Sequence, residues 1–314
     1  MLLPRSSYLN RTHPHYLNDY RQLNANVVPD NFCLPRVEDI LADCAKGTMW
    51  STLDMTDAFF QTRVKPEDVH KTTVTTPWGN YQWQVMPMGF RNAPAIHQRR
   101  IIQALNDHLG TICHVFMDDS VIWSSPEEHM ESVRKVLLKL RKAGLRLNEK
   151  KCNFFCTQVK YLGHKISRNG IEACEGKADK IMCWPVPKSA TEVQGFLGIV
   201  RYLSLFLPKL AEQTNILDKL TVKNADKKFP EWSQQHQDAF DTIKTIVASR
   251  DCLTTIDHKD LGNNNIYVTT DASDKCSGAM LSFGPTWETA RPVAYDSMTF
   301  KCVELNYPML KRNF

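Results

Sequence analysis

The sequence lacks the features of a membrane protein or a secreted protein. Its apolar runs are only a few residues long, whereas a transmembrane helix needs about 20 consecutive apolar residues. The first ten residues have neither the basic start nor the long apolar middle of a secretory signal. The 10 cysteines show no paired spacing, which favours reduced thiols in the cytosol or nucleus over a disulfide framework.

Repeats and low-complexity tracts are also missing, which excludes solenoid and collagen-like architectures. Cys152 and Cys156 are separated by three residues but lack a second Cys or His pair, so the sequence favours free thiols over a zinc site there. What is present is ordinary for a globular chain: 314 residues, of which 42% are hydrophobic and 23% charged. At about 150 residues per domain, this length predicts about two domains.

Positive charge is concentrated in one part of the chain. The net charge is +5, but residues 134–188 hold fourteen Lys and Arg against four Asp and Glu. Tyr161, Trp184 and Tyr202 lie in or near this basic segment. The pattern is compatible with a track for a phosphate backbone and also with a solvated helix face. Composition alone favours the solvated face.

Two predicted elements place acidic residues at strand ends. Residues 47–64 predict a strand that ends near Asp54 and runs into a short helical turn. Residues 111–124 contain two apolar runs around the tetrad Phe116-Met117-Asp118-Asp119, which predicts a hairpin with the acids in its turn.

A well-marked helix follows the predicted hairpin. Ser125 is the expected N-cap, Pro126 the first helical residue and Glu128 the partner in a capping box, while Gly144 ends the helix. Its apolar stripe is expected to consist of Met130, Val133, Leu137 and Leu140.

Further elements are predicted in the second half of the chain. Strands are expected over 145–148 and 159–167, with a turn at Asn169-Gly170. Ser189 and Glu192 predict a second capping box. It opens a helix that Pro208 ends, with an inward face of Val193, Phe196, Leu197, Val200 and Leu203. Residues 221–231 mark a boundary, and 266–270 predict a strand that ends at Asp271 and pairs with 279–283.

The carboxylates Asp54, Asp118 and Asp119 suggest a metal site. Adjacent carboxylates in an apolar context repel one another and lose hydration, and a cation relieves that cost. Oxygen ligands without a nearby His suit Mg²⁺, and two such ions about 4 Å apart are typical of phosphoryl transfer. An isolated Asp-Asp pair is more often a simple polar turn.

The order of the motifs along the chain favours the metal site over the simple polar turn. The sequence resembles the reverse transcriptases of gypsy-class long-terminal-repeat retrotransposons, and more distantly those of retroviruses, from about Tyr16 to Pro308. The resemblance depends on NDYRQLN at 18–24, LDMTDAF at 53–59, VMPMGFRNAPAIHQ at 85–98, FMDD at 116–119, Lys151-Cys152 with Phe154, YLGHKIS at 161–167, FLGIVRYLSLF at 196–206 and TTDAS at 269–273.

The resemblance implies an active site around these acids. Asp54, Asp118 and Asp119 would hold two Mg²⁺ ions, or Mn²⁺, with the Met55 carbonyl as an added ligand. Lys151 would protonate the leaving pyrophosphate. The implied nucleotide-binding residues are Asp57, Ala58, Phe59, Met88, Gly89 and Met117. Phe59 would exclude ribonucleotides at the sugar, although it also suits an ordinary core position.

The resemblance also implies contacts with a primer–template duplex. Tyr161, Leu162, Gly163 and His164 would belong to a hairpin that positions the primer 3′ end. Gln194, Gly198 and Tyr202 would form a helix stripe along the minor groove, although Gly198 also suits close helix packing. Asp271 matches the first carboxylate of a ribonuclease H domain.

The implied fold is α+β, a right-hand polymerase with a ferredoxin-like palm, a helical thumb and a partial ribonuclease H-like sheet. The expected domains are N-terminally truncated fingers at 1–29 and 61–92, palm at 30–60 and 93–168, thumb at 169–222, linker at 223–262 and ribonuclease H-like residues at 263–314.

Four positions depart from the family pattern. His15 replaces an Arg that grips the triphosphate, and Met88 and His97 stand where Phe is common. Asn313 replaces the second ribonuclease H acid, so we expect no ribonuclease H activity and a loosely held sheet with little helix over it. Protease, integrase and zinc knuckles are absent from the sequence.

The predicted function is RNA-directed DNA polymerase of a retrotransposon, in a cytoplasmic particle and also in the nucleus. Its partners would be a primer duplex on an RNA or DNA template and deoxynucleoside triphosphates, without a membrane. The alternatives are a degenerate retroelement protein that binds nucleic acid without polymerising, and a generic two-metal nuclease. The nuclease would need a His or Lys near the acids and lacks the ordered motifs.

Overall fold

The computed structural model describes residues 18–221, 229–249, 252–254, 256, 262–273 and 275–300. The chain divides into two compact units, Met1–Val159 and Lys160–Phe314. The sequence predictions that concern His15 and Asn313 lie outside the described residues. Within the described ranges, no helix is long and apolar enough to cross a bilayer.

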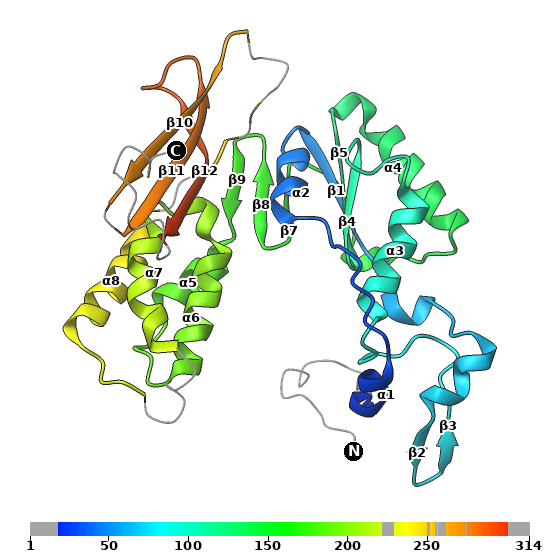
Figure 1. Ribbon diagram of the computed structural model, residues 1–314. Coiled ribbons are helices and arrows are strands. Elements are labelled where there is room, and N and C mark those ends of the chain that lie inside the picture. The colour runs from blue at the N-terminus through cyan, green and yellow to red at the C-terminus, as the bar shows by residue number, and fades with distance from the viewer. Residues whose placement is uncertain are drawn as a thin grey trace. The chain divides into compact units, whose positions relative to one another are not determined.

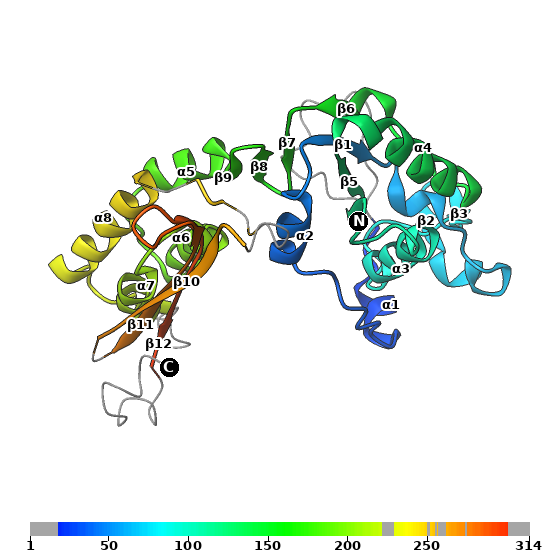
Figure 2. The same cartoon turned by 90° about the horizontal axis from the view of Figure 1, so that it is seen from above.

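The first unit is built around a four-stranded antiparallel sheet in the order β4-β5-β1-β6 (Figures 1 and 2). Its strands are β1 Met49–Asp54, β4 Cys113–Phe116, β5 Asp119–Ser124 and β6 Asn153–Cys156, with a small hairpin of β2 Val74–Thr76 and β3 Gly79–Tyr81. Its helices are α1 Arg21–Asn26, α2 Val37–Cys44, α3 Ala93–Leu105 and α4 Pro126–Lys142, with the 3₁₀ turns η2 Ala58–Gln61, η3 Pro66–Thr72 and η4 Glu149–Lys151.

The main core of this unit lies between the sheet and two helices. Helices α3 and α4 cover one side of the sheet and α2 lies on the other side (Figures 1 and 2). Leu53 of β1, Ile101 and Leu105 of α3, and Val136 and Leu140 of α4 are buried together. On the α2 side, buried Trp50 donates a hydrogen bond from its indole to the Cys44 carbonyl at 2.7 Å. These contacts fix β1, whose last residue is the predicted catalytic Asp54.

The predicted hairpin and the strand before Asp54 are confirmed as β4, β5 and β1. Helix α4 begins at Pro126 as predicted, but the Ser125 side chain accepts no capping hydrogen bond, so the capping box is wrong. Met130 is 65% exposed and does not belong to the core stripe. The buried face is formed instead by His129, Ser132, Val133, Val136 and Leu140.

The second unit contains a helical bundle and two small sheets. One sheet has the order β7-β8-β9 and the other β10-β11-β12. The strands are β7 Gln158–Tyr161, β8 His164–Ser167, β9 Gly170–Ala173, β10 Asn265–Ala272, β11 Cys276–Gly284 and β12 Arg291–Thr299. The helices are α5 Glu175–Met182, α6 Ala190–Tyr202, α7 Leu210–Asp218 and α8 Gln234–Ala248, with η5 Ser204–Phe206 and η6 Lys219–Thr221.

Helix α6 follows the sequence prediction closely. The Ser189 hydroxyl accepts a hydrogen bond from the Glu192 backbone N–H at 3.2 Å. The Glu192 carboxylate accepts from the backbone N–H of Lys188 at 2.8 Å, one residue earlier than a capping box requires. The five predicted inward residues are all buried. The helix ends at Tyr202, well before Pro208.

Three other expectations need correction. Residues 145–148 form no strand, only a single bridge between Leu147 and Met55. Residues 159–167 contain two strands, β7 and β8, joined by a tight turn. The ribonuclease H-like sheet has a third strand, β12, and α7 packs against β11 and β12, so the expectation that little helix covers this sheet is wrong.

Candidate active site

Pairing of β1 with β5 brings the predicted acids together at one end of the sheet. Asp54 and Asp119 face each other in the antiparallel register. The Met55 backbone N–H donates to the Asp118 carbonyl at 3.2 Å, so the turn residue also lies beside the end of β1. Residues directly opposite on antiparallel strands have Cα atoms about 5 Å apart. All three acids therefore project from one small region of the first unit.

The charges in this region are crowded. Partial burial, together with the like charges of Asp118 and Asp54, raises the pKa of Asp119, while nearby Lys151 lowers it. The Lys151 ammonium contacts both Asp54 carboxylate oxygens, at 3.2 and 3.1 Å. In the part of the chain that is described, no three His, Cys, Asp or Glu side chains are grouped closely enough to hold a metal. The backbone thus brings the acids together, while Lys151 pairs with one carboxylate.

A buried glutamine fixes the turn that carries Asp118. The Gln98 amide donates to the Val115 carbonyl at 2.9 Å and its carbonyl accepts from the Met117 backbone N–H at 2.6 Å. Met117 has a φ of 59°, a left-handed conformation that costs a non-glycine residue energy. The Gln98 bond offsets part of that cost. Gln98 therefore holds the acidic turn against helix α3.

The predicted gate residue Phe59 lies in η2, directly after β1 and the left-handed Asp57. Phe59 is partly buried, and its ring meets the edge of His97 with centroids 5.7 Å apart and planes at 89°. Arg100 of α3 ties down the end of η2 by donating to the Gln61 carbonyl at 2.6 Å. Helix α3 therefore supports both η2 and the acidic turn.

His97 is fully buried, and neither ring nitrogen has a hydrogen-bond partner among the described residues. Burial lowers the pKa of His97 to about 4; the charge of Asp118 opposes this shift and Arg100 adds to it. The ring is therefore neutral at physiological pH. The sequence expectation that His97 puts a polar ring into an apolar packing position is confirmed.

Three of the other predicted nucleotide-binding residues are Ala58, Met88 and Gly89. Ala58 packs against the main core, and Met88 is partly buried. Gly89 has a φ of 90° and its carbonyl accepts a hydrogen bond from Asn24 at 2.9 Å. A side chain at Gly89 would press on the Asn18 carbonyl at 3.3 Å. The positive φ and this close contact explain the glycine at position 89 without any contact to a nucleotide.

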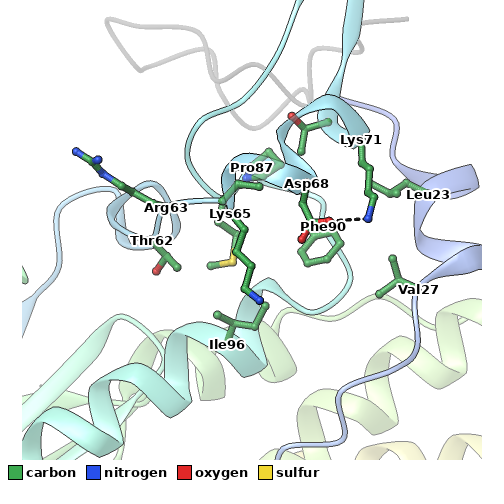
Figure 3. A pocket seen from close by; sticks show the side chains of 13 residues that line it. Leu23, Val27, Thr62, Arg63, Lys65, Asp68, Lys71, Pro87, Phe90 and Ile96 are labelled. Atoms are coloured by element: carbon green, nitrogen blue, oxygen red, sulfur yellow. Dashed lines mark hydrogen bonds and ion pairs between the residues drawn. The ribbon is translucent and has the colours of Figure 1, made fainter.

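A separate cavity of about 370 Å³ lies in the first unit and contains none of the predicted catalytic residues (Figure 3). Its apolar lining includes Leu23, Val27, Pro87, Phe90 and Ile96, and the Asp68–Lys71 ion pair of 2.5 Å lies along it. Thr62 to Lys65, which follow η2, form another part of its wall.

In the second unit, the predicted primer-positioning residues form the β7–β8 turn. Tyr161 and His164 are buried, whereas Leu162 and Gly163 form the tip. The hydroxyl of Tyr202, from α6, donates to the Leu162 carbonyl. His164 stacks on Tyr202 and Phe206 with centroid distances of 5.1 and 5.5 Å. Tyr202 and His164 therefore support the hairpin from within.

The other members of the α6 stripe are open. Gln194 and Gly198 are exposed, and a Cβ at Gly198 would meet nothing within 4 Å among the described atoms. Close packing of a neighbouring helix thus gives no reason for glycine at this position. The proposed approach of a nucleic acid backbone stays a prediction.

Asp271 lies on β10 and has an ion-pair partner. Its carboxylate pairs with Lys209 at 2.9 Å, and both side chains are mainly exposed. The backbone N–H of Ala211, at the start of α7, donates to the Ser297 hydroxyl on β12 at 3.0 Å. A shallow cavity of about 160 Å³ lies over this contact.

Gln98 is the last residue of the motif at 85–98 and had no predicted role, and Arg100 lies two residues beyond that motif. A usable signal was present: His97, Ile101 and Leu105 are spaced by four residues, which puts them on one helix face. Gln98 adjoins that face, and a buried glutamine needs partners. The identity of those partners, Val115 and Met117, could not be read from spacing.

Comparison with known families gives two matches. Residues 10–166 match the model of the family described as reverse transcriptase (RNA-dependent DNA polymerase). Residues 232–314 match the RNase H-like domain found in reverse transcriptase. The second match begins before the predicted start of the ribonuclease H-like region and includes α8.

Among curated proteins, the chain is similar to transposon polyproteins of Schizosaccharomyces pombe (strain 972 / ATCC 24843). It is 36% identical to the Tf2-3 polyprotein and 35% identical to the Tf2-7 polyprotein, over 290 residues and 92% of this chain in each case. The chain spans about a fifth of the length of these relatives, 21%.

Among solved structures, the fold is similar to that of foamy viral protease-reverse transcriptase. The complex of its dRH form with double-stranded DNA has a TM-score of 0.84 at 23% identity, over 99% of this chain and 53% of that chain. The complex with an RNA/DNA hybrid has a TM-score of 0.79 at 23% identity, over 97% and 40%. At this identity the likeness establishes the α+β fold.

Proposed function

Because this chain belongs to the reverse transcriptase family and is related to gypsy-like retrotransposon polyproteins, we propose that it is an RNA-directed DNA polymerase. It would transfer deoxynucleotides to a primer 3′ end on an RNA or DNA template. The foamy viral relatives were solved with an RNA/DNA hybrid and with double-stranded DNA, which supports a duplex as the partner.

The observation that carries the proposal is the meeting of Asp54, Asp118 and Asp119 at the ends of β1 and β4–β5. Burial first, and then the like charges of Asp118 and Asp54, raise the pKa of Asp119. The described side chains form no ready metal-binding cluster, so the support for the proposal is the strand pairing, together with the preference of Mg²⁺ for carboxylate oxygens. These three acids and the Met55 carbonyl would hold two ions, which when bound lower the pKa of the attacking hydroxyl and stabilise negative charge on the leaving group.

Lys151 has a second role in this proposal. Its ammonium is paired with Asp54, so the site carries a proton donor within 3.2 Å of a predicted ligand. An ammonium held beside the leaving phosphates can give up a proton as charge develops on oxygen. Its exposed position, with 59% of the side chain accessible, allows it to move from Asp54 to that oxygen.

Phe59 would select deoxynucleotides. The ring is carried by η2 directly after the first acid, and its edge contact with His97 restricts where it can move. A bulky ring beside the sugar leaves no room for a 2′-hydroxyl. Met88, Gly89, Asp57, Ala58 and Met117 would shape the rest of the nucleotide pocket.

Ribonuclease H activity is proposed to be absent, although the RNase H-like region is present. Hydrolysis of a hybrid needs several acids to hold two metals. Asp271 is engaged by Lys209, and Asn313 stands where the family has a Glu.

Primer extension on poly(rA)/oligo(dT) with Mg²⁺ tests the proposal. The full chain should extend the primer, and Asp118→Asn should abolish extension while duplex binding is retained. Asp107→Asn is a matched control, because Asp107 is an exposed aspartate that pairs with Lys139 on the same unit. Normal duplex binding without extension by the unmodified chain would instead establish the non-polymerising alternative.

A further inference from the structure

The tip of the β7–β8 hairpin has an unusual backbone. Leu162 and Gly163 have φ values of 46° and 73°, so two successive residues are left-handed. This geometry suits a tight hairpin turn, but it is costly for leucine because it has a side chain. The tip must therefore be held by its neighbours.

Two of those neighbours are aromatic, and the buried Nδ1 of one of them, His164, has no hydrogen-bond partner among the described residues. Tyr202 donates its hydroxyl to the Leu162 carbonyl. His164 is buried, and it stacks on Tyr202 and Phe206. Neither ring presents a charged group to a ligand at the tip.

The third neighbour is Lys177, from helix α5. Its ammonium nitrogen lies 2.9 Å from the centroid of the Tyr202 ring. A Cβ built on Gly163 would come within 2.6 Å of the same nitrogen and within 2.6 Å of the Tyr202 hydroxyl. Because Gly163 has no side chain, the Lys177 ammonium can lie at the hairpin tip.

The charge of Lys177 has no carboxylate partner among the described residues, since no ion pair there includes it. Burial lowers the pKa of Lys177, and the nearby charge of Lys180 acts in the same direction, whereas Cys174 opposes it. A partly desolvated cation without an anion is stabilised by a ligand that brings negative charge. The contact with Tyr202 compensates for only part of the lost hydration.

We propose that Lys177 binds a backbone phosphate of the nucleic acid strand whose end the β7–β8 hairpin positions. This inference rests on the proposed function, because it takes the hairpin to lie against the primer. A phosphate supplies the missing negative charge, and a lysine ammonium binds phosphate as a point charge. The tip then contributes backbone shape from Leu162 and Gly163 and one cation from Lys177.

The test is a salt titration of duplex binding, which needs no polymerase activity. Fluorescence anisotropy of a labelled RNA/DNA primer–template is measured for the full chain with Lys177→Met and Lys177→Arg. Methionine keeps an apolar stem over Tyr202 but removes the charge, and arginine keeps the charge. Lys165→Met is the matched control, since Lys165 lies on β8 of the same hairpin and already pairs with Glu172 at 3.2 Å.

One lost phosphate contact lowers the log–log salt slope by about 0.9 on a duplex. We expect this decrease in Lys177→Met, with weaker binding at low salt, and a near-normal slope in Lys177→Arg and Lys165→Met. Circular dichroism and the melting temperature check that each variant is folded. A folded Lys177→Met protein with an unchanged slope overturns the inference and leaves the polymerase proposal intact. An unmodified chain that binds no duplex overturns the proposed function itself.

Discussion

Replacement of His97 by Phe should stabilise the first unit. The imidazole is fully buried and its two nitrogens have no hydrogen-bond partner among the described residues. A neutral imidazole has one donor and one acceptor, and a phenyl ring has neither. The substitution removes both unpaired groups and can keep the edge-to-face contact with Phe59.

The size of the effect follows from these groups. Each buried polar group without a partner costs about 1–3 kcal/mol, while a slightly larger ring in a packed core costs about 1–3 kcal/mol. Two such groups together cost about 2–6 kcal/mol, so after the packing cost the net gain is expected to centre on about 2 kcal/mol. For a domain of about 150 residues, this raises the melting temperature by about 4–8 °C.

A pH series adds a second readout with a defined sign. The pKa of His97 is about 4 in the folded chain, below the ordinary value of 6.5. Between these values the unfolded state binds the proton and the folded state does not, so stability is full above pH 6.5 and is lost as the pH falls towards 4. His97→Phe removes this contribution, and its stability should decline less over the same range.

Amide hydrogen exchange of β1 and β5, together with thermal unfolding, measures both effects in the first unit. His70→Phe is the matched control, because His70 is exposed in η3 and its replacement should change stability by less than about 0.5 kcal/mol. A His97→Phe protein that is less stable than the parent at pH 7, or equally sensitive to acid, would refute the reasoning.

Three further predictions concern activity. Phe59→Val should admit ribonucleotides while deoxynucleotide use is nearly unchanged, and unaltered discrimination in primer extension would show that Phe59 is only a packing residue. Gln98→Leu should lower the extension rate at least about tenfold, because the Met117 N–H and Val115 carbonyl lose a buried partner; a normal rate argues against this support. Hybrid degradation should be absent, and cleavage that disappears in Asp271→Asn would contradict this.

The ends of the main elements could be predicted from the sequence because they depend on local chemistry. Pro126 starts α4 and Ser189 caps α6, as their residue types predict. The buried face of α4 could not be predicted in the same way. His129 is buried there because Ser51 and Ser124 contact its two ring nitrogens at 2.8 and 2.7 Å. Ser51 is distant in sequence, so no local pattern indicates it.

In the candidate site, too, contacts between distant parts of the sequence could not be predicted from local patterns. The resemblance implied that Asp54, Asp118 and Asp119 act together; the β1–β5 register places Asp54 opposite Asp119, but that pairing joins distant parts of the sequence and no local pattern indicates it. Lys151 was indicated by family resemblance as a proton donor, whereas its ion pair with Asp54 was not predicted. Strand β12 was missed because Arg291, Pro292 and Asp296 interrupt the apolar alternation that marks a strand.

The strand order β4-β5-β1-β6 has a consequence for how the first unit folds. Strand β1 is synthesised first, but its neighbours β5 and β6 begin only at Asp119 and Asn153. Long loops must close before either pair forms, which makes folding slow and leaves Trp50 and Leu53 exposed in the meantime. Chains shortened to end before Asp119 will lack both neighbours of β1 and aggregate during synthesis, so this strand depends on sequence that leaves the ribosome much later.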